Sequence, residues 1–333
     1  MRIKVIEMHP QTHGNASSDL TAVNAARCLL AFGAQPHVRV YPGAPKPLLL
    51  PAKPDPEIHG DDGLGGVEGL PPVDSAEVLA LFATNEDGST VRALEGMANS
   101  VKEIWNKGAG HKVTIISSGP MTNIALFVSV YPDLLDAVEE FVFMGGGVGI
   151  GNRSAVAEYN ILCDRKFFAT HVELIPILIQ YSQLAHACQI VLDAPVKKTM
   201  IPINVTHTAV VTKHIQAQLL APDAVPPSDD VLPSPTSNLR HTLSTLITFF
   251  GDSYKSTFGF KDGPPLHDAL TIGYVSNPEL FKATRHRVDV ELNGTHCMGE
   301  TVVDVWGHRD CDDSWGSNGR NCLVAQSLDV SPF

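Results

Sequence analysis

The chain of 333 residues has little positive charge for its size. It carries 24 lysine and arginine residues against 36 aspartate and glutamate residues, so its formal net charge is -12. No run of five or more basic residues occurs anywhere in it. A surface of this sign repels phosphate backbones and anionic lipids. We therefore expect neither nucleic acid nor a membrane as the main partner.

Long apolar runs and paired cysteines are also missing. No segment reaches the roughly 18 consecutive apolar residues of a membrane span, and the apolar stretch after Met1 is too short for a signal peptide. The six cysteines are scattered without a C-x-x-C pair, which favours free thiols over disulfides or a zinc site. These absences predict a cytoplasmic protein.

Short β-rich runs alternate with helical patterns along the chain. Buried strands are predicted over 112–117 and 141–144, and helices over 18–32, 120–130 and 239–258. Such alternation predicts an α/β fold with a mainly parallel sheet flanked by helices.

Three further segments complete this outline. Residues 221–238 are rich in proline, serine and aspartate, which predicts a mobile loop. Residues 287–292 and 300–306 have the pattern of two paired strands near the end of the chain. We expect one domain over 1–333.

Polar and glycine-rich motifs follow the predicted strands. Met144-Gly-Gly-Gly-Val-Gly-Ile-Gly-Asn152 continues the strand over 141–144, and Glu158-Tyr-Asn160 comes shortly afterwards. Pro264-Pro-Leu-His267-Asp268 puts an imidazole beside a carboxylate where a helix is predicted to begin. Ligands of parallel sheets bind at the carboxyl ends of the strands. These groups together suit a ligand rich in hydroxyls, such as a sugar.

Each motif taken alone also has a structural interpretation. Asp268 could cap a helix, Met144 could belong to the core, and Asn152 could be a turn residue. Glu158 and Asn160 are two residues apart, so they share a face only on an extended segment. That spacing favours a two-point clamp on a sugar.

The glycine-rich run over 145–151 invites one alternative, a dinucleotide-binding dehydrogenase. The run follows a predicted strand, but Asn-Arg-Ser comes next in place of a clear helix. The dinucleotide fingerprint requires that helix, so this alternative is disfavoured.

A series of short motifs extends over nearly the whole chain. They are Thr12-His-Gly-Asn15, His59-Gly-Asp-Asp-Gly-Leu-Gly-Gly66, Ser118-Gly-Pro-Met-Thr-Asn123, Met144-Gly-Gly-Gly, Gly151-Asn152, Ala157-Glu-Tyr-Asn160, Asn204-Val-Thr-His207, Pro265-Leu-His-Asp-Ala269 and Gly299-Glu-Thr-Val-Val-Asp304. In this order and at these spacings they resemble the inosine-uridine nucleoside hydrolase family. The resemblance implies a Rossmann-like nucleoside hydrolase fold and hydrolysis of ribonucleosides to ribose and free nucleobase.

The resemblance also implies a role for each matching residue. A calcium ion would be held by Asp268 and by the backbone carbonyl of Ser118, which suits the hard oxygen ligands that Ca²⁺ prefers. The resemblance also implies residues that contact the nucleoside. The ribose would be bound by Asn15, Asn152, Glu158 and Asn160, with Met144 lining the sugar pocket, and the nucleobase would lie beside His59 and His267. His267 would give a proton to the leaving base. The resemblance further implies a possible homo-oligomer, while the choice between purine and pyrimidine nucleosides stays open.

Two departures from the family pattern carry expectations of their own. Family members begin with a strand and an Asp-x-Asp-Pro-Gly-x-Asp-Asp turn, and this chain contains no Asp-x-Asp-Pro-Gly. We therefore expect the first strand and part of the metal site to be missing. Residues 165–188 replace a short helix of the family, which predicts an insertion. These departures favour an alternative function: an impaired or inactive relative, from truncation or altered splicing, that at most binds nucleosides.

Overall fold

The computed structural model describes residues 9–11, 16–35, 37–48, 55–163, 187–223 and 231–330. Asn15 and most of the predicted insertion lie outside these residues. The predicted loop over 221–238 is described except for 224–230. Among the described residues, no helix is both long enough and apolar enough to cross a membrane.

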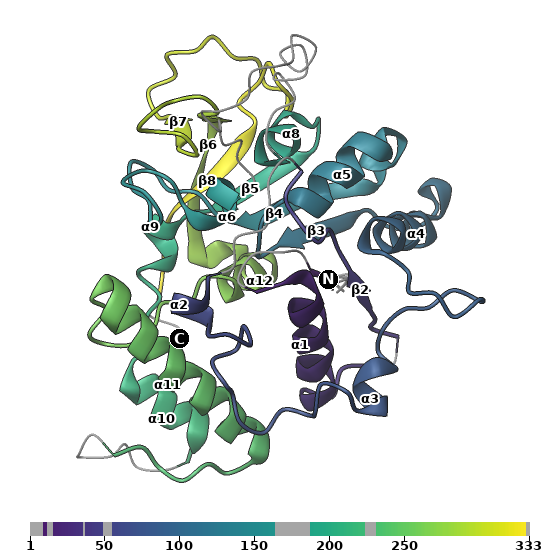
Figure 1. Cartoon of the computed structure of the whole chain (residues 1–333). Helices are drawn as coiled ribbons and strands as arrows, with labels where there is room; N and C mark the ends of the chain where they lie inside the picture. The colour runs from purple at the N-terminus through teal and green to yellow at the C-terminus, as the bar shows by residue number, and fades with distance from the viewer. Residues whose placement is uncertain are drawn as a thin grey trace, which may run out of the picture.

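The strands form a large sheet and a small separate one (Figure 1). In the small sheet β1 (His9–Gln11) pairs in parallel with β2 (Val40–Pro42). The large sheet has the spatial order β3-β4-β5-β8-β6-β7. Its strands are β3 (Val113–Ser117), β4 (Val138–Met144), β5 (Lys197–Ile201), β6 (Phe281–Val290), β7 (Thr301–Asp304) and β8 (Cys322–Leu328).

Four neighbouring strands of the large sheet are parallel. β3, β4, β5 and β8 run in one direction, and β6 is antiparallel to both β8 and β7. The predicted mainly parallel α/β fold is confirmed. The predicted pair over 287–292 and 300–306 corresponds to the end of β6 with β7, whereas β8 was not predicted at all.

The helices lie on both faces of the large sheet and around the small one (Figure 1). They are α1 (Ser18–Ala31), α2 (Pro56–His59), α3 (Ala76–Leu79), α4 (Ala93–Trp105), α5 (Thr122–Val130), α6 (Tyr159–Cys163), α8 (Ala187–Asp193), α9 (Ile203–Thr206), α10 (Lys213–Leu220), α11 (Asn238–Phe258) and α12 (Ala269–Ser276). The helices predicted over 18–32, 120–130 and 239–258 match α1, α5 and α11 to within two residues at either end.

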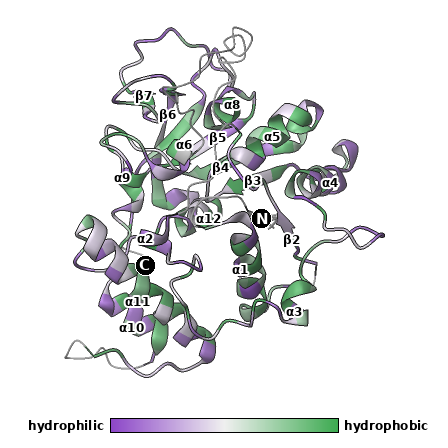
Figure 2. Cartoon of the chain, in the orientation of Figure 1, coloured by the Kyte–Doolittle hydropathy of each residue, from purple (hydrophilic) through white to green (hydrophobic). Residues whose placement is uncertain are grey.

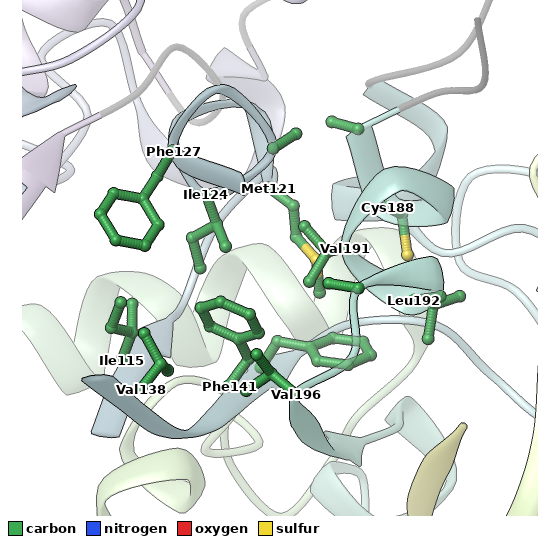
Figure 3. Close-up of a cluster of buried hydrophobic side chains, with 14 of the residues drawn as sticks. Ile115, Met121, Ile124, Phe127, Val138, Phe141, Cys188, Val191, Leu192 and Val196 are labelled. Carbon is green, nitrogen blue, oxygen red and sulfur yellow. The ribbon is translucent and has the colours of Figure 1, made fainter. Parts of the chain in front are cut away.

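Strand β4 separates the two layers of the core, because successive side chains of a strand point to opposite faces. Phe141 and Phe143 join the large cluster formed with α5 and α8, and Figure 3 shows Phe141 beneath Ile124 of α5. Val142 points the other way, into the cluster that includes α12. Burying one such side chain contributes about 1.5–3 kcal/mol. Burial on both faces thereby fixes the position of β4, and with it the start of the loop that follows Met144.

Helix α11 forms a pair with α10 away from the sheet (Figure 1). Ser237 caps its start by accepting a hydrogen bond from the Arg240 amide at 3.3 Å. Gly259 ends it in the left-handed conformation at φ 77°, which glycine adopts without strain. Gln216 of α10 donates to Ser244 and Thr248 of α11. Figure 2 shows mixed polar and apolar colouring along α11, as expected for a helix with only one buried side.

Candidate active site

A pocket of about 280 Å³ lies beyond the carboxyl ends of β3 and β4. Its walls come from α2, the loop after β4, the segment before α12, and α11. Every predicted site residue that the structure describes lines it, although these residues are scattered in the sequence. They are His59, Ser118, Met144, Asn152, Glu158, Asn160, His267 and Asp268.

The loop after β4 is organised by the buried Glu158 carboxylate. This group accepts backbone N–H bonds from Gly146 at 3.0 Å, Asn160 at 3.0 Å and Ile161 at 3.2 Å. Burial raises the pKa of Glu158 to about 7, although the amide donors act to lower it. Gly146 has φ +75°, and a Cβ there would lie 2.8 Å from Thr301. The loop can therefore wrap around the carboxylate only with glycine at that position.

Two asparagine side chains are oriented by the same loop in opposite senses. The oxygen of Asn152 accepts a hydrogen bond from the Tyr159 amide at 2.9 Å. The amide nitrogen of Asn160 donates to the carbonyl of Met144 at 3.2 Å. Asn152 can therefore offer a donor to a ligand, and Asn160 can offer an acceptor. A pair of this kind matches a sugar hydroxyl, which both donates and accepts.

His267 is held on one side only. Its Nδ1 lies 2.7 Å from the Thr206 hydroxyl, while its Nε2 is buried and has no hydrogen-bond partner among the described residues. Burial lowers the pKa of His267 to about 3, with smaller effects from His207 and His59. The ring is therefore neutral at neutral pH. If the Thr206 hydroxyl donates to Nδ1, the neutral ring carries its proton on Nε2 and can donate it to a ligand.

Asp268 supplies a carboxylate at the opening of helix α12. Asp268 is exposed at the surface of the pocket. The protein around it raises its pKa above the ordinary value, and the nearby Glu158 carboxylate adds to this effect. Within the described ranges no basic side chain forms an ion pair with Asp268, and no three His, Cys, Asp or Glu side chains are grouped so that they could hold a metal ion. Ser118, which follows β3, lines the same pocket. Both residues offer hard oxygen donors of the type that Ca²⁺ accepts.

An apolar wall on α11 was not predicted. Leu246, Phe250, Tyr254 and Phe258 are spaced four residues apart and all face the pocket. The Tyr254 ring packs against His267 at 5.6 Å between centroids. The sequence does contain this signal, because apolar residues at spacing four form one stripe of a helix.

Two histidines and one arginine of this region differ in their relation to the pocket. His59 packs edge-on against Phe250 at 5.6 Å, and burial lowers its pKa to about 4. His207 lies behind the pocket, edge-on to His267 at 5.5 Å. Arg240, unlike Tyr254, does not line the pocket and instead donates to the carbonyl of Leu219.

The family model of inosine-uridine preferring nucleoside hydrolases matches residues 10–166 and 185–333. The chain belongs to this family. It is 31% identical over 324 residues to a probable ribonucleoside hydrolase of Dictyostelium discoideum, covering 96% of this chain and 82% of that protein. It is 30% identical to the pyrimidine-specific ribonucleoside hydrolase RihA of Shewanella woodyi, covering 96% and 84% of the two chains.

Solved nucleoside hydrolases share its fold. The purine-preferring ribonucleoside hydrolase from Gardnerella vaginalis superposes with a TM-score of 0.71 at 24% identity, covering 97% of this chain and 85% of that one. The plant nucleoside hydrolase PpNRh1 gives 0.69 at 22% identity, covering 95% and 84%. The predicted family, fold class and enzyme class are thereby confirmed for this nucleoside hydrolase. The family match leaves out 167–184, inside the segment predicted to be an insertion. The calcium ion, the homo-oligomer, the cytoplasmic location and the missing strand stay predictions.

Proposed function

We propose that this chain hydrolyses the N-glycosidic bond of ribonucleosides with the assistance of a calcium ion. One observation carries the proposal: an unpartnered, buried imidazole nitrogen and a loop of oriented amides face the same pocket. The imidazole of His267 suits a leaving base, and the loop of Asn152, Glu158 and Asn160 suits a ribose. In the reaction the bond between C1′ and the base nitrogen breaks, and the oxygen of water bonds to C1′. The base leaves with a proton.

Ribose recognition would fall to the loop after β4. Asn152 would donate to one hydroxyl, and Asn160 would accept from another. Glu158 holds both ends of the loop through its amide contacts. Its Oε2 accepts two N–H bonds and its Oε1 accepts the one from Asn160. Because the groups are oriented before a ligand arrives, little ordering cost remains at binding.

His267 would assist departure of the base. Because the ring is neutral, it would donate a hydrogen bond to the leaving nitrogen and stabilise the negative charge that develops on the base, an effect of about 10²–10³-fold for one well-placed donor. The departing base would take its proton from water. The Thr206 contact supports the ring orientation that this role needs. The flat rings of Phe250 and Tyr254 would cover the apolar faces of the base.

The donor set suits calcium as the cofactor. Asp268 and the Ser118 carbonyl are hard oxygen donors, and the Asp268 carboxylate has a raised pKa without a described basic partner. A cation beside it would favour its ionised form. When bound, the ion would polarise the attacking water and orient the ribose diol.

Calcium binding and base release together test the proposal. Inosine and uridine are supplied with calcium or with a chelator, and release of free base is measured. Calcium affinity is measured separately by calorimetry. Asp268→Asn should weaken calcium binding and base release together, whereas Asp262→Asn, at an exposed aspartate, should change neither. Normal calcium affinity in Asp268→Asn would remove Asp268 from the metal site.

A second candidate is an impaired relative that binds nucleosides without cleaving them. It is favoured by one observation: the described residues contain no group of three or more His, Cys, Asp or Glu placed to hold a metal. Calcium normally takes six to eight oxygen ligands. For this candidate, calorimetry would detect nucleoside binding, while no base would be released at any calcium concentration.

A further inference from the structure

Asp55 and Arg153 connect two walls of the pocket. Asp55 directly precedes helix α2, which ends at His59. Arg153 follows Asn152 in the loop after β4. The Arg153 guanidinium forms an ion pair with the Asp55 carboxylate, and their side chains are only 20% and 12% exposed. The pair thus links the wall that carries His59 to the wall that carries Asn152.

The guanidinium also contacts the third wall. Its carbon lies 5.6 Å from the ring centroid of Phe258 on α11 and 5.7 Å from that of Tyr159. Both aromatic residues line the pocket, as do Asp55 and Arg153. A planar cation can pair with a carboxylate and lie over aromatic rings at once, which a lysine ammonium cannot reproduce. Arg153 is therefore a point at which three separate elements meet.

The backbone on either side of the pair is already fixed. The amides of Asn152, Arg153 and Ser154 all approach the carbonyl of Ala157 within 3.1–3.3 Å. On the other side, the amide of Gly60 bonds to the Pro56 carbonyl at 2.9 Å. An ion pair between two such rigid turns fixes the position of one turn relative to the other. Its loss would free one wall relative to the other.

We propose that the Asp55–Arg153 pair is a clasp that positions His59 and Asn152 around a bound nucleoside. The inference rests on the proposed function for its substrate. Both residues of the clasp are positioning residues, because their charges are directed at each other. Without the clasp, the substrate itself must order the two walls of the pocket when it binds. The free energy of that ordering then weakens binding. We expect KM to rise while kcat changes little.

An ion pair on the surface would do none of this. Exposed pairs contribute roughly 0–1 kcal/mol, and the chain offers a matched example in Arg320 and Asp313, with side chains 53% and 85% exposed. The clasp differs in its burial, in its two aromatic contacts and in its place on the pocket wall. Removing Arg320 therefore serves as the control for removing Arg153.

Hydrogen exchange on the ligand-free protein tests the clasp without relying on hydrolysis. The variants are Asp55→Asn, Arg153→Met, the double variant, and Arg320→Met as control. In each single variant, amides of 56–66 should exchange on the order of 10-fold faster, while amides of β4 stay protected and report an intact fold. Because the two residues act through one bond, the double variant should exchange no faster than the singles. Unchanged exchange over 56–66, or additive effects, would overturn the clasp.

Kinetics then tests what the clasp does for the substrate. Asp55→Asn and Arg153→Met should each raise KM for inosine or uridine about 10-fold and change kcat less than about 3-fold. Arg153→Lys should restore only part of the KM. If the unchanged chain releases no base, the proposed function fails while the exchange result still decides the clasp. If base release and KM are normal in both variants, the clasp is wrong and the proposed function stands.

Discussion

Two buried polar regions of this molecule differ in whether their polar groups have hydrogen-bond partners. Lys198 on β5 is fully buried, and its ammonium donates to the carbonyls of Leu192, Ala194 and Trp315. In the pocket, by contrast, the buried Nε2 of His267 has no partner among the described residues. Glu158 there accepts hydrogen bonds from amides of its own loop.

The difference separates a structural role from a functional one. A buried donor or acceptor without a partner costs about 1–3 kcal/mol. Lys198 avoids that cost because three carbonyl acceptors surround its ammonium, which leaves no bond for a ligand to complete. In the pocket, the unpartnered Nε2 of His267 keeps this cost in the ligand-free protein. A ligand that forms the missing hydrogen bond would regain that free energy on binding. Four changes test this contrast, starting with the largest expected effect.

Removing one hydroxyl from the ligand should have the largest effect, because it tests the hydrogen-bonding groups of the pocket directly. If Asn160 and its loop bind the ribose diol, 2′-deoxynucleosides should be cleaved up to about 10⁴-fold less efficiently, because buried polar groups would then stay unpaired. The measurement is kcat/KM for matched ribo- and deoxynucleosides. The discrimination should shrink in Asn160→Ala. Equal cleavage of the two sugars would mean that the loop does not read the diol.

Removing the unpartnered imidazole should affect rate and stability differently. His267→Ala should lower kcat by about 10²–10³-fold, with the largest drop for nucleosides whose base leaves poorly. The free energy of unfolding should fall only by what the Thr206 contact and the ring packing against Tyr254 contribute, since Nε2 has no described partner to lose. Rates come from base release and stability from urea denaturation. A small, uniform loss of rate would reduce His267 to a packing role.

The structural charge should behave in the reverse manner. Lys198→Met would leave three carbonyl oxygens without their shared donor and should destabilise the fold by on the order of 3 kcal/mol. Lys282→Met, at an exposed position on β6, is the matched control. Urea denaturation measures both. A Lys198→Met protein that is as stable as the control would show that the carbonyls find other donors.

Changing pH should affect stability through Glu158. The pKa of Glu158 in the folded chain is raised from its ordinary value of 4.5 to about 7. The folded state thus retains a proton that the unfolded chain has released. Its contribution to stability is complete below pH 4.5 and is lost as pH rises toward 7, by up to about 3 kcal/mol. We expect a lower free energy of unfolding at pH 8 than at pH 5, and a smaller difference in Glu158→Gln. Equal slopes in the two proteins would contradict this.

Much of the pocket could be predicted because its residues sit in compact local motifs. The glycines around Gly146 indicate a turn that other residues cannot adopt, and His267-Asp268 has the pattern of a helix start, here that of α12. The stripe of Leu246, Phe250, Tyr254 and Phe258 was present in the sequence and was missed. Its spacing identifies one face of a helix but does not say what lies opposite.

Other features depend on contacts between distant residues. Asp55 and Arg153 are 98 positions apart, and nothing in the local pattern of either residue indicates that they pair. Strand β8 was missed because a short apolar run after a polar, glycine-containing segment gives only a weak local signal. Its place in the sheet is set by its pairing with β5 and β6. Local propensity cannot supply such long-range pairings.

The central position of β8 has a consequence for synthesis on the ribosome. The chain emerges from its N-terminus, yet the strand that joins β5 to β6 is formed by residues 322–328. Until those residues are released, two strand edges stay open, and open edges recruit other chains. Until then the large sheet can form only as two separate parts, β3-β4-β5 and β6-β7. A ribosome that stalls before residue 322 would therefore present an aggregation-prone intermediate.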